Sequence, residues 1–387
     1  MKKVYLDYAA TAPTDPEVLR AMEPYFYGKF GNASSLHSYG QEAKKAIEDS
    51  RQELASFIGA DPGEIVFTSG GTESDNFALL GTAYALEKKG DHIITSAIEH
   101  HAVTEPLKFL EKRGFRVTYL KVDKHGLVSP RDLEEAITDK TILVSIMHAN
   151  NEIGTIQPVP ELGKIARERG VCFHTDAVQT VGHIPLNVDE LNADLLSLSA
   201  HKFYGPKGVG ALYVRKSRRL ETFMRGGDQE RGRRGSTYNT PGIVGLGSAI
   251  RICREKMDEE AGLQVSLRDK LLKEIPARIP EVILNGHPAR RLPNNVNFSI
   301  KYIEGESMLL SLDLLGIACS TGSACTSSSL EPSHVLLAIG LNHENAHGSL
   351  RISLGRWTKS GDIDYLLEKL PQVVQKLRAM SPLYEER

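Results

Sequence analysis

The chain has 387 residues, of which 41% are hydrophobic and 25% charged, and its formal net charge is −2. This is the composition of an ordinary soluble globular protein, and the length suggests about two domains. The near-neutral charge gives no electrostatic reason to expect nucleic acid or an anionic membrane as a partner.

Short β-rich runs alternate with helical patterns through the first two thirds of the chain. Continuous apolar strands separated by helices predict a mainly parallel sheet that is covered on both faces. The fold class is therefore α/β, with a seven-stranded sheet. The predicted strands are residues 64–69, 92–96, 116–122, 141–147, 171–176, 194–199 and 208–214.

After Gly247 the pattern changes to a long charged helix, and later strands at 294–300 and 348–355 alternate with helices. This change predicts a second, smaller α+β domain. We place the large domain at residues 16–255. The small domain then comprises residues 1–15 and 256–387.

The four cysteines show no paired CxxC spacing, which indicates neither a zinc site nor a disulfide framework. A reduced, cytoplasmic setting is expected. The start of the chain lacks the apolar segment of a signal peptide, and no run approaches the ~18 apolar residues of a membrane span. The cysteines are Cys172, Cys253, Cys319 and Cys325.

Polar residues gather where three of the predicted strands end, which is where open α/β sheets bind their ligands. "SGGTES" follows the first strand, Asp176 ends the fifth, and His201 and Lys202 follow the sixth. Taken alone, the glycine-rich turn is a routine connection, Asp176 a helix cap, and Lys202 a surface lysine. Together they provide a phosphate cradle, an acid for a ring nitrogen and a lysine for covalent attachment, which pyridoxal phosphate needs.

The motifs resemble those of cysteine desulfurases of the NifS/IscS group, within the class V aminotransferase family of fold-type I enzymes. The resemblance runs from end to end of the chain. It implies a pyridoxal phosphate-dependent sulfurtransferase that acts on L-cysteine as a homodimer, with active sites near the subunit interface. The matching motifs include "YLDYAATAP", "FGNASSLHSYG", "EIVFTSGGTESDN", "HANNEIGTIQP", "HTDAVQTVG", "SAHKFYGPKGVGALYVR", "STGSACTSSSLEPSHVL" and "LRISLGRWT".

The resemblance also implies roles for individual residues. Lys202 corresponds to the lysine that holds the cofactor, Asp176 to the partner of the ring nitrogen, and His100 to the histidine that stacks on the ring. Arg351 matches the arginine that grips the substrate carboxylate, a task suited to a planar guanidinium. The other matching positions are Gly71, Thr72, Ser199 and His201 around the phosphate, Thr237 from the other subunit, Gln179 at the ring, and Asn151 and Asn32 near the substrate.

The loop "STGSACTSSSLEPS" at 320–333 carries Cys325 among small and hydroxylated residues. From spacing alone, Cys325 reads as an inert loop thiol. The resemblance instead makes it the nucleophile that takes sulfur as a persulfide, and a loop of small residues suits delivery to an acceptor. The implied acceptor is a scaffold protein of iron–sulfur cluster assembly, in whose complex Cys325 is a possible cluster ligand. Cys319 follows an apolar run, and we expect it to be packed.

The sequence departs from the family pattern at some positions, and parts of it also fit other functions. Gly71 stands where alanine is common, and "RRGST" at 233–237 replaces the usual arginine-serine-glycine-threonine order. "HENAH" at 343–347 fits H-E-x-x-H, the zinc motif of metalloproteases, but nearby glycines leave barely one helical turn and no third ligand is evident. We therefore expect no resident metal. Selenocysteine lyase is the nearest alternative within the enzyme class.

Overall fold

The computed structural model describes residues 2–321 and 331–384. Its largest element is a seven-stranded sheet with the strand order β2-β8-β7-β6-β5-β3-β4. Strand β8 is antiparallel to both of its neighbours, and the other pairs are parallel. All seven predicted strands are present. They are β2 (Ile65–Thr68), β3 (His92–Ser96), β4 (Arg116–Leu120), β5 (Thr141–Ser145), β6 (Cys172–Asp176), β7 (Leu195–Ser199) and β8 (Gly210–Val214).

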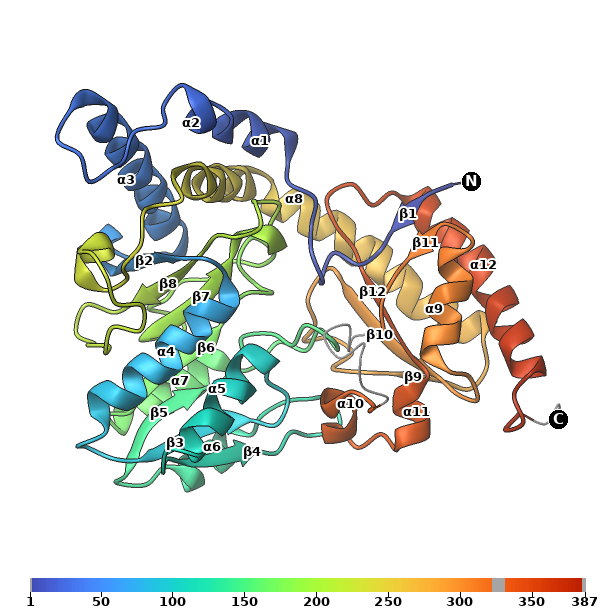
Figure 1. The fold of residues 1–387 in the computed structure, drawn as a ribbon. Coiled ribbons are helices and arrows are strands. Elements are labelled where there is room, and N and C mark those ends of the chain that lie inside the picture. Colours follow the sequence, from blue (N-terminus) through green and yellow to red (C-terminus); the bar gives the residue numbers. More distant parts are fainter. Residues whose placement is uncertain (1, 322–330, 385–387) are drawn as a thin grey trace.

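Helices cover both faces of this sheet (Figure 1). Successive strand residues point to opposite faces, and on β6 Phe173 packs in one core while Cys172 packs in the other. Because both faces are buried, the strands read as continuous apolar runs. The helices of this part are α1 (Pro16–Met22), α2 (Pro24–Tyr27), α3 (Ser38–Ile58), α4 (Gly71–Leu86), α5 (His101–Glu111), α6 (Pro130–Ala136), α7 (Val159–Glu168) and α8 (Thr240–Arg278).

A smaller part is built around a three-stranded antiparallel sheet with the order β12-β10-β9. The beginning of the chain joins this part, because β1 pairs in parallel with β11. Its elements are β1 (Val4–Tyr5), β9 (Val282–Leu284), β10 (Asn295–Ile300), β11 (Ile317–Ala318), β12 (Ser349–Ser353), α9 (Gly305–Asp313), α10 (His334–Ala338), α11 (His343–His347) and α12 (Ser360–Ala379).

Helix α8 connects the two parts and runs along both of them (Figure 1). Along this helix Cys253 is the last residue in the core of the large part, and Leu267 is the first in the core of the small part. The predicted limit at 255/256 falls between these two residues. Near the other predicted limit, Val4 and Leu6 pack in the small part, while Val18 packs in the large part.

Candidate functional site

A glycine cradle lies at the carboxyl end of β2. Gly70 has φ +154, a backbone conformation that glycine adopts easily, and α4 begins at Gly71. No side chain among the described residues caps the start of this helix, so its first N–H groups are available to an anion. A Cβ built on Gly70 would lie 3.7 Å from Ser199 Oγ, so the hydroxyl that ends β7 faces the cradle.

A Cβ on Gly71 would lie 2.8 Å from Val178 Cγ2. Such a contact is too close for an ordinary side chain. Glycine at this position, where the family commonly has alanine, therefore agrees with the packing around Val178.

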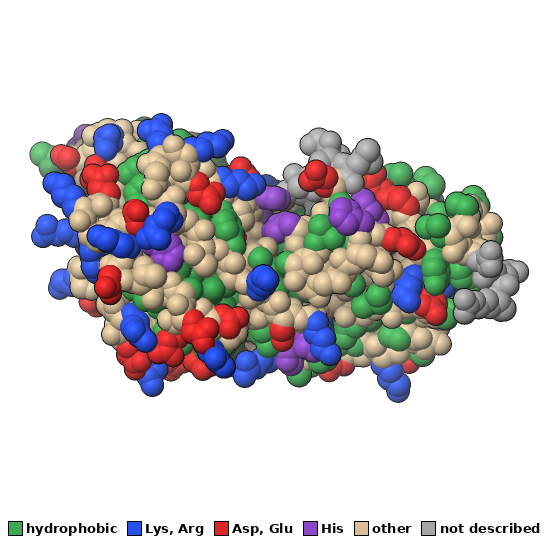
Figure 2. Space-filling view, turned by 90° about the horizontal axis from the view of Figure 1, so that it is seen from below, with side chains coloured by type: hydrophobic (Ala, Val, Ile, Leu, Met, Phe, Trp, Pro, Cys, Tyr) green, Lys and Arg blue, Asp and Glu red, His purple; other side chains and the backbone are tan. Residues whose placement is uncertain are grey.

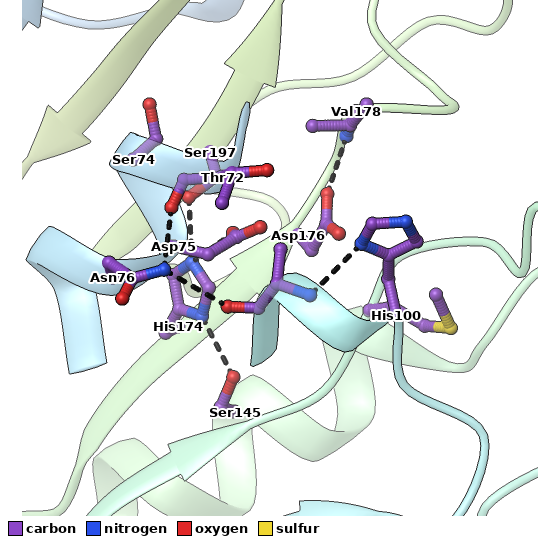
Figure 3. A network of polar contacts seen from close by, with 12 residues as sticks. Thr72, Ser74, Asp75, Asn76, His100, Ser145, His174, Asp176, Val178 and Ser197 are labelled. Carbon is purple, nitrogen blue, oxygen red and sulfur yellow. Dashed lines mark hydrogen bonds and ion pairs between the residues drawn. The ribbon is translucent and has the colours of Figure 1, made fainter. Parts of the chain in front are cut away.

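The second turn of α4 and the strands beneath it contain a buried polar network (Figure 3). His174 Nδ1 lies 2.8 Å from Ser145 Oγ, and its Nε2 lies 3.0 Å from Ser197 Oγ and 3.6 Å from Asp75 Oδ1. Burial, and then the nearby charge of Asp176, raise the pKa of the Asp75 carboxyl well above its usual value. Burial lowers the pKa of His174 to about 3, so its imidazole is neutral.

Asp176 ends β6, two residues after His174, and therefore lies on the same face of the strand. Its side chain is buried, and Oδ1 accepts a hydrogen bond from the Val178 N–H at 2.9 Å. Burial raises the pKa of Asp176 to about 6, while the Val178 N–H and the charge of Lys202 act in the opposite direction. A cation placed opposite this carboxylate would favour its ionised form.

Lys202 is held by the N-terminal segment of the chain. Its Nζ donates to the carbonyl oxygens of Ala9 at 2.6 Å and Ala10 at 2.8 Å. Gln179 Nε2 donates to the same Ala9 oxygen at 3.1 Å. The predicted lysine and the predicted ring-contacting glutamine therefore meet at one carbonyl group.

Two predicted histidines lie close enough to Lys202 for its charge to affect them. Burial, and then Lys202, lower the pKa of His100 and of His201 to about 4, so both rings are neutral near pH 7. His100 Nδ1 accepts from the Ala102 N–H at 3.1 Å, at the start of α5. His201 Nδ1 lies 3.0 Å from Thr11 Oγ1. In the face of the molecule that Figure 2 shows, several histidine side chains gather near the middle.

Arg351 lies in β12, and its guanidinium is tied to two distant segments. Nη2 lies 2.8 Å from Asp7 Oδ1, and Nη1 donates to the Asn151 carbonyl at 3.1 Å. Among the described residues, Nε is buried and has no hydrogen-bond partner. Two predicted substrate-binding residues, Arg351 and Asn151, are therefore in direct contact, although it is the backbone of Asn151 that takes part.

Three predicted residues are exposed rather than packed into this site. Thr72 is exposed in the first turn of α4. Asn32 is exposed between α2 and α3, where its Oδ1 accepts from the Ser34 N–H at 2.9 Å. Thr237 is also exposed and lines a cavity of about 150 Å³ together with Thr68. The roles of Thr72, Asn32 and Thr237 stay predictions, as do those of the other site residues.

The predicted nucleophile, Cys325, lies outside the described residues. The residues on either side of the undescribed stretch, Thr321 and Glu331, line a cavity of about 1140 Å³ that is also lined by Cys319. Cys319 packs against the core of the small part, and burial, with the charges of Asp7 and Asp313, raises the pKa of its thiol to about 12. Cys319 is thus a poor nucleophile in this structure.

The "HENAH" motif forms α11, a helix of five residues. Within residues 2–321 and 331–384, no group of three histidine, cysteine, aspartate or glutamate side chains is placed to hold a metal ion. The zinc-protease alternative therefore gains no support. No helix in the described part of the chain is both long and apolar enough to cross a membrane.

The sequence prediction did not assign a role to Asp7, to the backbone at residues 9 and 10, or to the pair formed by Asp75 and His174. The segment around Asp7 lies about 190 to 340 residues from its partners, and no local pattern predicts such contacts. His174 could have been found, since a polar residue two positions before Asp176 must share its face of β6.

The chain matches the family model described as Aminotransferase class-V over residues 4–366. It is 57% identical over 385 residues to "Cysteine desulfurase IscS" of Dictyoglomus turgidum, covering 100% of this chain and 98% of that protein. It is 56% identical over 382 residues to the protein of the same name from Methanosarcina thermophila, covering 99% and 94%.

Two solved structures also align with most of the chain. A structure described as "NIFS-LIKE PROTEIN" aligns with a TM-score of 0.92 at 39% identity, covering 97% of this chain and 100% of that one. One described as "SspA in complex with cysteine" aligns with a TM-score of 0.81 at 39% identity, covering 92% and 100%. The predicted fold class is confirmed.

Proposed function

The chain belongs to the aminotransferase class-V family, and on that premise we propose that the protein is a cysteine desulfurase of the IscS type. It removes the sulfur of L-cysteine, releases L-alanine, and carries the sulfur as a persulfide on Cys325. One observation from the site supports this proposal most directly. The Asp176 carboxyl, the amine of Lys202 and the uncapped start of α4 lie at one edge of the large sheet.

We infer that pyridoxal phosphate is the resident cofactor, and the residues present fit it. The start of α4 and Ser199 suit the phosphate, while the buried Asp176 suits a protonated ring nitrogen. Lys202 would hold the cofactor covalently, and His100 would stack on the ring. When bound, this cofactor supplies an electron-accepting ring that stabilises negative charge at the substrate Cα.

The residues of the chain then bind the substrate and move protons. Arg351 holds the substrate carboxylate, and Lys202 takes the Cα proton and returns a proton when alanine forms. Asp176 stabilises positive charge at the ring nitrogen because it is buried and negatively charged. His100 is neutral near pH 7, and since its Nδ1 accepts from the Ala102 N–H, the other ring nitrogen carries the hydrogen and can donate a hydrogen bond.

The atoms and electrons of the sulfur transfer balance without any further reactant. The Cys325 thiolate attacks the substrate sulfur, an S–S bond forms, and the substrate C–S bond breaks. The carbon that loses sulfur takes up a proton, so cysteine and one enzyme thiol become alanine and one enzyme persulfide. A thiolate is needed because the neutral thiol is a weak nucleophile.

We propose a homodimer in which the exposed Thr237 contributes to the phosphate site of the other subunit. The persulfide is passed to a scaffold protein that assembles iron–sulfur clusters. We place the protein in the cytoplasm, where thiols stay reduced.

The test is the stoichiometry of products from L-cysteine. Purified enzyme, supplied with pyridoxal phosphate and a reducing agent, should release sulfide and alanine in equal amounts. Lys202→Ala should release neither and should lose the absorbance of covalently held cofactor. Release of pyruvate and ammonia in place of alanine would assign a different lyase reaction and overturn the proposal.

A further inference from the structure

Arg351 already has a carboxylate partner within its own chain. Its Nη2 lies 2.8 Å from Asp7 Oδ1, and the arginine side chain is only 3% exposed. Its Nη1 is used by the Asn151 carbonyl. The cation expected to bind the substrate carboxylate is therefore neutralised before any substrate arrives.

Asp7 is held at this place by the fold. An isolated parallel bridge links it to Ser353, which lies in β12, the strand that carries Arg351. Asp7 is the more exposed member of the ion pair, at 19%, and it lines the cavity of about 1140 Å³ together with Ser320 and Thr321. Asp7 therefore faces a space that a ligand can enter, whereas Arg351 itself does not line it.

Of the three guanidinium nitrogens, Nε is the one without a partner among the described residues, and it can serve a second carboxylate. This nitrogen is also buried. Nε and Nη2 form one edge of the guanidinium, the edge that commonly binds carboxylates with two parallel hydrogen bonds. Occupation of that edge by substrate would bring a second negative charge next to Asp7.

We propose that Asp7 competes with the substrate carboxylate for Arg351 and thereby sets the affinity of the enzyme for L-cysteine. This inference rests on the proposed function. Asp7 keeps the buried cation paired in the resting protein, which avoids an uncompensated charge. A substrate carboxylate on the Nε–Nη2 edge shares Nη2 with Asp7, whose negative charge already lies 2.8 Å away. The arginine therefore binds the substrate less tightly than it would without this carboxylate partner.

The test uses the holoenzyme with Asp7→Asn, which keeps an oxygen acceptor for Nη2 and removes the negative charge. The KM for L-cysteine should fall about tenfold, the effect of removing one charged competitor for a hydrogen bond, and kcat should change less than KM. The dissociation constant of 3-mercaptopropionate, which has the thiol and carboxylate but no amine, should fall similarly. Cysteamine, which has no carboxylate, should bind as before.

Two further variants keep the test decisive. Asp7→Ala also removes the charge and should shift affinity in the same direction. Asp189→Asn is the matched control, because Asp189 Oδ1 lies 2.8 Å from Arg215 Nη1 in an ion pair outside the site. The Asp189→Asn enzyme should bind 3-mercaptopropionate as tightly as the native enzyme does.

Unchanged or weaker binding of 3-mercaptopropionate by both Asp7 variants would overturn the inference. In that case native enzyme that still releases sulfide and alanine from cysteine would leave the proposed function standing. Native enzyme that releases neither would remove the proposed function itself.

Discussion

The ion pair between Arg51 and Glu230 should be one of the most sensitive points of the fold. The two side chains are 4% and 2% exposed, and two hydrogen bonds of 2.8 Å join them. Burial alone would lower the pKa of Arg51, but Glu230 more than reverses this, so the pKa is raised. Glu230 also accepts from the Phe67 N–H at 3.1 Å, in the strand that leads to the glycine cradle.

Glu230→Gln would leave the Arg51 cation buried without its main partner. Removing one member of a buried pair costs about 3–5 kcal/mol. We expect about 3 kcal/mol, the lower end of that range, because Glu48 remains 3.2 Å from Arg51 Nε. The double variant Arg51→Met with Glu230→Gln removes both charges and should lose less stability than the sum of the two single variants.

Urea unfolding followed by circular dichroism, at one fixed protein concentration, measures these differences. Glu53→Gln is the control, because Glu53 pairs with Arg254 at the same 2.8 Å but both side chains are about 40% exposed. Its effect should stay within about 0.5 kcal/mol. A loss below about 1 kcal/mol for Glu230→Gln, or strictly additive single and double variants, would mean that the buried pair does not stabilise the fold in this way.

The remaining predictions concern the backbone, the catalytic charges and pH. Ser236 has φ +115, where glycine is favoured, so Ser236→Gly should raise the unfolding free energy by about 1 kcal/mol. The exposed control Ser217→Gly should give no such gain, and equal effects would contradict the strain argument. Asp176→Ala should mainly lower kcat, whereas Arg351→Ala should mainly raise KM, as steady-state kinetics with L-cysteine would measure; normal turnover by Asp176→Ala would exclude its assigned role. Burial raises the pKa of Glu99 to about 8, so its protonated form stabilises the fold at low pH and this stabilisation is lost as the pH rises through that value. Glu99→Gln should therefore gain unfolding free energy relative to the native chain as the pH rises from its ordinary pKa of 4.5 to about 8, and a constant difference over this range would contradict the shift.

Much of the fold could be predicted because the strands carry two buried faces. Residues such as Ile93 and Ile94, adjacent on β3, pack in opposite cores, and this produces the continuous apolar runs that mark a covered parallel sheet. Ligands bind at the carboxyl ends of such strands, and this rule placed Asp176 and Lys202 in one predicted site.

The contacts of the N-terminal segment could not be predicted in the same way. Asp7 meets Arg351 and Ala9 meets Lys202 only because β1 joins the small part while the chain then crosses to α1 (Figure 1). These pairings depend on how the two parts pack, and neither local periodicity nor residue type indicates them. The sequence did not indicate the positive φ of Ser236 either, although the altered residue order at 233–237 marked that position.

Cys325 should be the residue that receives the sulfur, and mass spectrometry after one turnover can show this. Enzyme loaded with pyridoxal phosphate is given one equivalent of L-cysteine, digested, and analysed by mass spectrometry without reductant. One added sulfur should appear on the peptide that contains Cys325, in the native enzyme and equally in Cys319→Ser, and none should appear there in Cys325→Ser. Sulfur found first on Cys319, or full sulfide release by Cys325→Ser, would contradict it.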